Sequence, residues 1–314
     1  MLDLSPEVLL QTAARIIPAV HRTPVLTSQS LNRRFGRELF FKCENFQRGG
    51  AFKIRGATNA VGMIGPATAS RGVATHSSGN HGAALALAAG ASGIACHVVM
   101  PRNSVRSKVE AVQAYGANVT FCAPTMASRQ ETLDAIVAQT GATVVHPYND
   151  EHVIAGQATA TMELLADVPR LDAVIVPIGG GGLAAGATLA ARHTAPQVQV
   201  FAAEPAGADD AMRSFAVGRL EPVGSPETIA DGLRASLGDK PFAILQQGLK
   251  AVVTVSESAI VEAMRLVWQR MKIVIEPSAA VPLAALLEER IDTTSNRVGL
   301  ILSGGNVDLD ALPW

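Results

Sequence analysis

The sequence predicts an α/β protein built on two open, mainly parallel sheets, one in a large lobe and one in a small lobe. First, short β-branched runs alternate with longer alanine-rich runs from residue 72 onward, separated by glycine, proline or polar residues. Second, the expected strands show no apolar-polar alternation, which is typical of parallel strands covered by helices on both faces. Third, 314 residues are long for a single core, because domains usually hold ~100–200 residues.

The first expected elements are a capped helix, a strand and a second helix. Ser5 followed by Pro6 is typical of a helix N-terminus, so we expect a helix from there to about residue 17. The aromatic run at 39–42 predicts a short strand. A helix over about 52–63 follows, and the Gly-Pro pair after it ends that helix.

The remaining elements are expected to divide between a small α/β domain over 70–149 and a large domain made of 1–64 and 150–314. In the small domain the pattern predicts strand 73–75, helix 82–89, strand 97–100, helix 104–115, strand 118–121, helix 126–139 and strand 143–145. In the large domain it predicts helix 154–165, strand 173–176, helix 183–191, strand 198–203, an irregular polar stretch over 205–240, strand 251–255, helices 257–271 and 282–289, and strand 298–302.

Composition and charge argue against nucleic-acid and membrane partners. The chain has 26 basic and 27 acidic residues and only 4% aromatic residues, so little is available to neutralise phosphates or stack on bases. Apolar runs such as 83–91 are too short to cross a bilayer, which needs ~20 residues. The first residues lack the basic region and apolar run of a secretory signal, and we therefore expect a cytoplasmic protein. Three cysteines far apart fit neither a disulfide framework nor a zinc site.

Lys53 lies between a glycine turn and an expected helix, next to Phe52. A lysine amine attacks a carbonyl only when part of its population is neutral, and removal from water beside an aromatic ring lowers the pKa of a lysine. A surface lysine at the start of a helix would show the same local pattern. Lys53 therefore needs partners elsewhere in the chain before it can be interpreted as a nucleophile.

Polar residues follow the expected strand at 73–75, in the run Thr75-His76-Ser77-Ser78-Gly79-Asn80-His81-Gly82. Hydroxyls, an amide and the N–H groups of a helix start can together bind a carboxylate. A plain helix cap would explain one polar residue, but not so many. This strand end is a candidate carboxylate site.

Four consecutive glycines, at 179–182, join an expected strand to an expected helix. Backbone N–H groups without side chains can surround a phosphate dianion at the positive end of a helix dipole. A competing interpretation is the GxGxxxG pattern of Gly180, Gly182 and Gly186 with Glu204 about 20 residues later, which suggests an NAD(P)-dependent oxidoreductase. That pattern gives no role to Lys53 or to the polar run at 75–82.

Two further strand ends carry polar side chains. Ser303 ends the last expected strand, and a hydroxyl can hydrogen-bond a neutral ring nitrogen without forcing its protonation. Glu204 and Asp210 lie in one loop, where carboxylates and a backbone carbonyl could bind Mg²⁺ or Ca²⁺ or could simply be solvated.

A lysine for a Schiff base, a glycine loop for a phosphate and a serine for a ring nitrogen are together what pyridoxal phosphate requires. From about residue 16 to 309 the sequence closely resembles the fold type II pyridoxal-phosphate enzymes, whose fold is that of the tryptophan synthase β-subunit, in the serine racemase and serine/threonine dehydratase group. The matching motifs are Phe-Lys-Ile-Arg-Gly at 52–56, Ser-Ser-Gly-Asn-His-Gly at 77–82, the glycines at 179–182, Ala-Glu-Pro with Ala-Asp-Asp at 203–210, Glu-Thr-Ile-Ala-Asp-Gly at 227–232 and Ser-Gly-Gly-Asn at 303–306.

The resemblance implies roles for residues in these motifs. The implied cofactor contacts are Lys53 in the Schiff base, Phe52 beside the ring, Asn80 at the phenolic oxygen, Ser303 at the ring nitrogen, and Gly179, Gly180, Gly181 and Gly182 around the phosphate. The implied substrate residues are Ser77, Ser78, Asn80 and His81, which receive the carboxylate, with Ser78 also acting as a second acid/base opposite the lysine. The implied metal ligands are Glu204, the Ala208 carbonyl and Asp210, for Mg²⁺, Ca²⁺ or Mn²⁺.

The resemblance also implies an activity. Lys53 removes the α-proton of L-serine or L-threonine while the cofactor ring stabilises the negative charge, and loss of the β-hydroxyl leads to a 2-oxo acid and ammonia. Reprotonation by Ser78 would make the enzyme a serine racemase as well. The segment Lys-Cys-Glu-Asn-Phe-Gln at 42–47 also resembles the 3-hydroxyaspartate dehydratases, which is the alternative in the same fold. A homodimer is expected.

Some residues depart from the family pattern or have an open role. Ala51 replaces the serine that many threonine dehydratases place before Phe-Lys, and Tyr148 stands where the animal racemase has asparagine. Arg129 could meet a second substrate carboxylate or lie on the surface of a helix. These positions leave the substrate open among serine, threonine and hydroxyaspartate.

Overall fold

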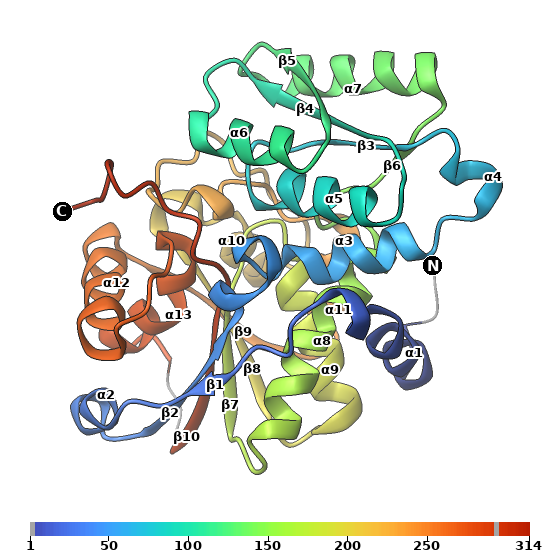
Figure 1. Cartoon of the computed structure of the whole chain (residues 1–314). Helices are drawn as coiled ribbons and strands as arrows, with labels where there is room; N and C mark the ends of the chain where they lie inside the picture. The colour runs from blue at the N-terminus through green and yellow to red at the C-terminus, as the bar shows by residue number, and fades with distance from the viewer. Residues whose placement is uncertain (1–3, 292–294) are drawn as a thin grey trace.

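Two β-sheets with helices around each of them make up the protein, as the computed structural model in Figure 1 shows. The structure describes residues 4–291 and 295–314, so the first three residues, part of the start used to exclude a secretory signal, lie outside the described residues. The six-stranded sheet has the order β1 (Val25–Leu26), β2 (Glu38–Cys43), β10 (Arg297–Leu302), β7 (Ala173–Pro177), β8 (Gln199–Pro205), β9 (Leu249–Val255). The four-stranded sheet has the order β5 (Asn118–Cys122), β4 (Cys96–Pro101), β3 (Val73–His76), β6 (Thr143–Val144).

The expected α/β fold with two mainly parallel sheets is confirmed. Every pair of neighbouring strands is parallel except β1 and β2, which are antiparallel. The α-helices are α1 (Pro6–Ile16), α2 (Gln29–Phe35), α3 (Lys53–Gly62), α4 (Pro66–Ala69), α5 (Asn80–Ala91), α6 (Arg106–Ala114), α7 (Met126–Thr140), α8 (Glu151–Asp167), α9 (Gly182–Thr194), α10 (Asp210–Val217), α11 (Asp239–Leu245), α12 (Glu257–Met271) and α13 (Pro277–Leu287).

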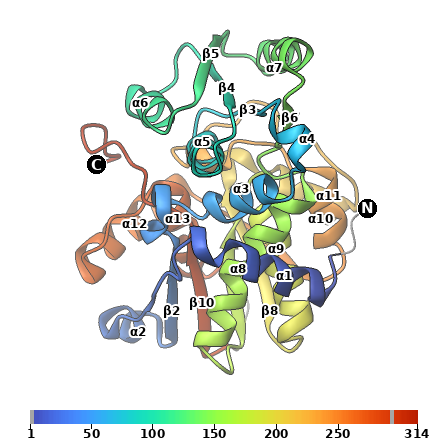
Figure 2. The same cartoon turned by 45° about the vertical axis from the view of Figure 1, so that its right-hand side comes forward.

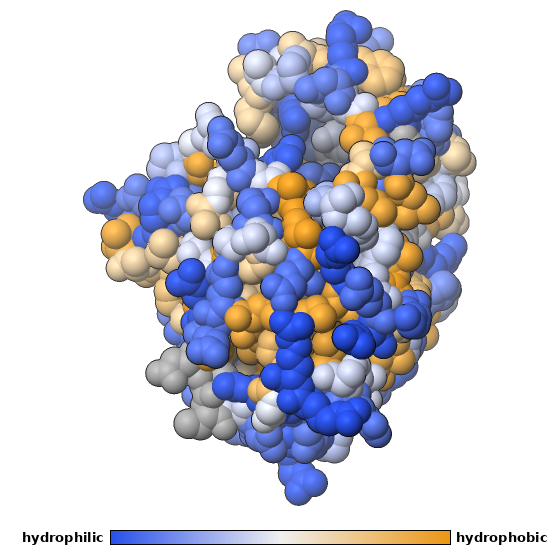
Figure 3. Space-filling view, turned by 90° about the vertical axis from the view of Figure 1, so that its left-hand side faces the viewer, coloured by the Kyte–Doolittle hydropathy of each residue, from blue (hydrophilic) through white to orange (hydrophobic). Residues whose placement is uncertain are grey.

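Helices cover both faces of each sheet, which explains the continuous apolar runs of the strands. On the large sheet, α12 and α13 pack on one face and α8 and α9 on the other (Figures 1 and 2). On the small sheet, α7 packs on one face and α5 on the other. The face seen in Figure 3 is hollowed between the upper part, which holds the small sheet, and the rest of the molecule.

Helix α3 lies between the two sheets and packs closely on α8. The close packing depends on Gly156, because a Cβ there would lie 2.5 Å from the backbone oxygen of Arg55. On the other side of α3, Ile54, Ala57 and Val61 belong to the core that α3 shares with α5. Helix α3 thus connects the two halves of the core through tight backbone contact.

The structure adds elements that the sequence pattern did not predict. Strand β1 and helix α2 precede β2, α4 follows α3, and the polar stretch 205–240 contains α10 and the start of α11. Helix α13 begins at Pro277 and not at Pro282. Both prolines fit a first helical turn, but Pro277 occupies it and Pro282 lies inside the helix, where its missing N–H leaves one intrahelical bond unmade. None of the described helices is long and apolar enough to span a bilayer.

Candidate active site

The loops that follow β2, β3, β7 and β10 contain most of the residues singled out in the sequence. In a parallel sheet the carboxyl ends of the strands share one edge, where ligands of open α/β folds bind. Two contacts tie three of these loops together: the Phe52 backbone N–H donates to the Ser303 carbonyl at 3.0 Å, and the Asn306 side chain donates to Asn80 Oδ1 at 2.9 Å. The lysine segment, the polar run and the last strand end therefore meet.

Lys53 is the first residue of α3, and its side chain is half-buried. Its Nζ donates a hydrogen bond to the Pro147 carbonyl at 2.8 Å and lies 5.1 Å from the centre of the Phe52 ring. Burial lowers the pKa of Lys53 to about 8, although the negative charge of Glu276 opposes this shift. At neutral pH roughly a tenth of such amines are neutral, far more than for a solvated lysine. The structure thus provides the neutral amine that a nucleophile needs.

The glycine loop is buried and has no room for side chains. A Cβ at Gly180 would lie 2.3 Å from the Tyr148 ring, and a Cβ at Gly179 would lie 2.8 Å from the Leu233 Cα. Gly181 has φ +90°, which other residues rarely adopt. It is also the N-cap of α9, and no side chain caps this helix, so the N–H groups of the first turn remain available for an anion.

Glu276, which the sequence analysis missed, lies at the centre of the site. Its two carboxylate oxygens accept hydrogen bonds from Asn80 Nδ2 at 2.9 and 3.1 Å. Burial and the nearby Asp231 raise the pKa of Glu276 to about 7. The Asn80 amide, which the resemblance places at a phenolic oxygen, is thus held by a carboxylate on one side and by Asn306 on the other. The sequence did contain a signal for Glu276: it lies directly before Pro277, the proline that occupies the first turn of α13.

The side chains of the polar run at 75–82 differ in burial and in hydrogen-bond partners. Ser77 and Ser78 are half-buried in the loop before α5. His81 Nε2 is 3.1 Å from the Val145 carbonyl, and its buried Nδ1 has no partner among the described residues. Burial and the nearby Lys53 lower the pKa of His81 to about 3. A neutral His81 that donates to Val145 cannot offer a ring N–H to a carboxylate, whereas the backbone N–H groups at the uncapped start of α5 can.

A group of ring side chains borders the lysine and the glycine loop. The rings of His146 and Tyr148 meet edge-to-face at 4.6 Å, and His76 meets His146 at 6.2 Å. His146 Nδ1 accepts from the Asn149 N–H at 2.9 Å, which leaves Nε2 as the protonated donor. Burial and, after it, the nearby Arg129 lower the pKa of His76. Arg129 itself is half-buried on α7, and its Nε is buried without a hydrogen-bond partner within 4–291 and 295–314.

The expected metal ligands lie together at the end of β8. Glu204 is fully buried and accepts hydrogen bonds from the Met212 and Ala211 N–H groups at 2.6 and 3.3 Å. Asp210 accepts from the Leu237 N–H at 2.8 Å, and its buried Oδ1 has no partner among the described residues. Burial raises the pKa of both carboxyl groups, that of Glu204 to about 9. No three His, Cys, Asp or Glu side chains gather into a metal cluster in the described part of the chain.

The same geometry argues against a dinucleotide at the glycine loop. In that interpretation Glu204 would bind a ribose hydroxyl. Its carboxylate instead binds the start of α10 and is closed off from solvent. Gly186, the third glycine of the pattern, allows α9 to pack on α8, since a Cβ would lie 2.7 Å from the Ala158 nitrogen. The glycine pattern therefore has a packing explanation.

The chain is similar to known proteins over nearly its whole length. Residues 16–304 match the model of the family described as pyridoxal-phosphate dependent enzyme. A β-hydroxyaspartate dehydratase of Paracoccus denitrificans is 50% identical over 98% of this chain and 98% of its own length. A serine racemase of Arabidopsis thaliana is 47% identical, covering 95% of this chain and 92% of its own. The structure of maize serine racemase superposes with a TM-score of 0.96 at 45% identity, over 98% of this chain and 94% of that one.

These likenesses agree with the resemblance drawn from the motifs. The matched family region contains the lysine segment, the polar run and the glycine loop. The structural match extends the agreement to the arrangement of both sheets. The chain therefore belongs to the pyridoxal-phosphate dependent enzyme family and has its type II fold.

Proposed function

We propose that this protein is a pyridoxal-phosphate dependent ammonia-lyase that removes water from a 3-hydroxy amino acid, L-serine or L-threonine in the first place, and releases a 2-oxo acid and ammonia. The observation that carries the proposal is Lys53, a half-buried lysine with a lowered pKa, next to Phe52 and hydrogen-bonded to Pro147. Both lyases and racemases of this family are similar to the chain. We also propose that residues 1–64 and 150–314 form a large domain and that residues 70–149 form a small domain.

The residues present fit the cofactor. Gly179 to Gly182 form a loop in which a Cβ at any position would meet neighbouring protein atoms, so its backbone N–H groups carry no side chains, and the uncapped N-terminus of α9 begins there. Ser303 is buried, and its backbone carbonyl accepts a hydrogen bond from the Phe52 N–H of the lysine segment. We assign the phosphate to this loop, the ring nitrogen to Ser303 and the covalent link to Lys53. When bound, pyridoxal phosphate supplies a conjugated ring that stabilises negative charge at the substrate α-carbon.

The chain's own residues then bind, orient and move protons. The N–H groups at the start of α5, with Ser77, Ser78 and Asn80, bind the substrate carboxylate. Lys53 Nζ takes the α-proton, since its lowered pKa leaves it a base near neutral pH. Ser78 belongs to the small-sheet side and would exchange a proton with the opposite face of the α-carbon, which is what racemisation requires.

We expect the purified protein to absorb in the visible range as a lysine adduct of pyridoxal phosphate and Lys53→Ala to lose this absorbance. The reason is that the adduct needs the amine of Lys53 itself. Absorbance spectra of both proteins at saturating cofactor provide the measurement. Ser78→Ala is the matched control: it keeps the absorbance and loses more of any racemase activity than of its elimination activity. An unchanged spectrum in Lys53→Ala would contradict the assignment of Lys53 as the residue that binds the cofactor.

A second candidate substrate is 3-hydroxyaspartate, which one specific observation favours. Arg129 has a buried Nε without a partner, near His76 at the end of β3. His146 presents a protonated Nε2 in the same neighbourhood. Two nitrogen donors near each other suit a second carboxylate better than the methyl group of threonine. The similar dehydratase of Paracoccus denitrificans acts on β-hydroxyaspartate by its name.

The substrate is decided by a panel of serine, threonine and the isomers of 3-hydroxyaspartate, assayed for ammonia and 2-oxo acid. If Arg129 binds a second carboxylate, Arg129→Gln lowers kcat/KM for 3-hydroxyaspartate by ~10- to 150-fold, because a hydrogen bond to a charged group contributes ~1.5–3 kcal/mol. Activity on serine changes little. Arg106→Gln, which removes an exposed arginine of α6, is the control. Equal losses on both substrates would refute this role of Arg129.

We also propose a divalent cation, Mg²⁺, Ca²⁺ or Mn²⁺, bound by Glu204, Asp210 and the Ala208 carbonyl. The partnerless Oδ1 of Asp210 and the burial of both carboxylates support the proposal, since buried carboxylates are costly unless paired with a cation. The site lies at the end of β8, where it ties α10 to that strand. We assign it a stabilising role rather than a chemical one.

Removing the cation with a chelator is expected to lower the melting temperature, because a ligand at 100 times its Kd adds about 2.7 kcal/mol of stability. Asp210→Asn should abolish the response to chelator and to added Mg²⁺, Ca²⁺ or Mn²⁺. Asp209→Asn changes the neighbouring carboxylate, which pairs with Arg213, and should keep the response. Thermal unfolding of the three proteins with and without chelator is the measurement. A wild-type protein indifferent to chelator would count against the site.

A further inference from the structure

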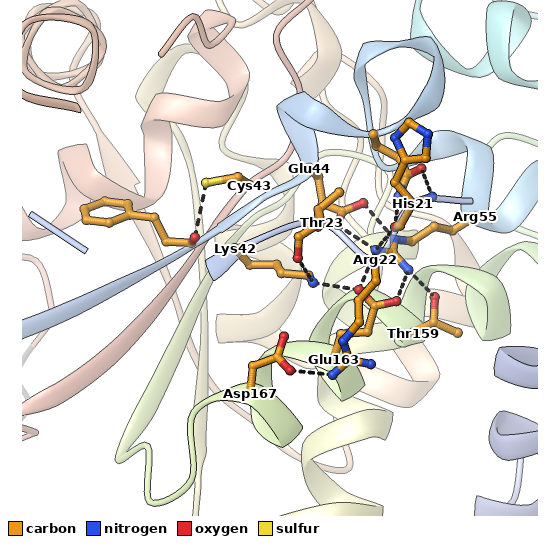
Figure 4. Close-up of polar contacts among 12 residues, drawn as sticks. His21, Arg22, Thr23, Lys42, Cys43, Glu44, Arg55, Thr159, Glu163 and Asp167 are labelled. Carbon is orange, nitrogen blue, oxygen red and sulfur yellow. Dashed lines mark hydrogen bonds and ion pairs between the residues drawn. The ribbon is translucent and has the colours of Figure 1, made fainter. Parts of the chain in front are cut away.

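A buried group of charges lies behind the lysine segment and takes no part in the proposed chemistry (Figure 4). Arg55, two residues after Lys53, has a side chain with no exposed surface. Its Nε and Nη2 donate to the two carboxylate oxygens of Glu44 at 2.7 and 2.8 Å. Its Nη1 and Nη2 donate to those of Glu163, both at 2.8 Å. One guanidinium thus holds two carboxylates in two-pronged contacts.

A second cation completes the group. Lys42 is fully buried, and its Nζ donates to Glu163 at 2.6 Å and to the Thr23 carbonyl at 2.7 Å. The Thr23 hydroxyl donates to Glu44 at 2.5 Å. Two positive and two negative side chains therefore balance, and each oxygen of both carboxylates accepts a hydrogen bond. Such pairing is what permits charges to be buried at all.

The group joins three elements next to the first turn of α3, which begins at Lys53. Arg55 lies in the first turn of α3, Glu44 follows β2, and Glu163 lies on α8. The first turn of α3 has no side-chain cap, and its backbone is tied to the large sheet through the Phe52 N–H. The backbone of this turn also packs on Gly156 of α8, so shape and the backbone bond already limit its movement. The guanidinium fork adds a defined orientation, because bidentate contacts accept only one.

We propose that Arg55 is a positioning residue for Lys53: its contacts with Glu44 and Glu163 set the rotation of the first turn of α3 and hence the place of Lys53 Nζ. The inference rests on the proposed function, in which that nitrogen holds the cofactor and moves the α-proton. A rotation of α3 by about 10° would move an atom at the end of a lysine side chain by about 1 Å. A misplacement of that size can cost about a hundred-fold in rate.

The simpler alternative is that the group only stabilises the fold. Buried ion pairs are weak evidence for stability, because apolar residues of similar volume often serve as well or better. What a guanidinium fork supplies and an apolar contact does not is a defined orientation. The two roles differ in what they predict for Lys53, since lost stability alone leaves its surroundings unchanged. The charged and titratable groups facing Lys53, which are Glu276, His81 and His146, are the same in either case.

The test uses the cofactor-loaded, full-length protein and the variant Arg55→Lys, which keeps the charge and loses the fork. We expect kcat to fall about a hundred-fold with a smaller change in KM. The acid limb of the kcat–pH profile, which reports the base in the substrate complex, should move up by about one unit as water reaches Lys53. The circular dichroism induced in the bound pyridoxal phosphate should decrease, since it reports how firmly the ring is held.

Leu133→Ala, a cavity variant in the buried face of α7, is the control for lost stability, because it lowers the melting temperature without touching α3. It should leave both the acid limb and the induced dichroism unchanged. If Arg55→Lys does not fold, Glu44→Gln gives the same readouts in the same direction, because it weakens the fork while keeping its shape. The proposal is overturned if these variants lose melting temperature and nothing else. A wild-type protein without bound cofactor would contradict the proposed function instead.

Discussion

The electrostatic pairing of Arg55 with Glu44 and Glu163 is the constraint on which the arrangement of the site depends. Charges can be buried only where partners satisfy them, so β2, α3 and α8 must meet in one relative position. The close packing of α3 on α8 at Gly156 imposes the same position through shape. Lys53, at the start of α3, therefore lies next to a junction that both charge pairing and close packing define, as a site that needs sub-ångström placement requires.

The second feature is the set of polar contacts that cross from the small sheet to the large one. Asn80, at the start of α5, binds Glu276 before α13 and Asn306 after β10. Farther out, Lys108 on α6 pairs with Asp231, in the segment whose Leu233 lies against the glycine loop. These contacts link the small sheet to the segment before α13, to the end of β10 and to the segment beside the glycine loop.

Local patterns predicted most of the fold, and the motifs predicted the family, whereas the roles of the site residues stay predictions. The patterns failed where long-range pairing decides the structure. The strands and the longer helices follow from hydrophobic runs between glycine and proline, and the parallel sheets follow from their lack of alternation. Helix α10 could not be foreseen, because it begins where Glu204 binds its first N–H groups. Glu276 and the partners of Arg55 were not predicted for the same reason. Glu163 is 108 residues from Arg55, and no spacing rule connects the two.

The central claim is that Lys53, and no other lysine, carries the cofactor. Lys42 is the instructive competitor, because it lies in the same segment but is fully engaged with Glu163 and Thr23. Reduction of the purified protein with borohydride, followed by peptide mass mapping, locates a lysine that is joined to pyridoxal phosphate. We expect the modification on Lys53 alone. Modification of Lys42 or of another lysine, or no modification in a protein saturated with the cofactor, would contradict it.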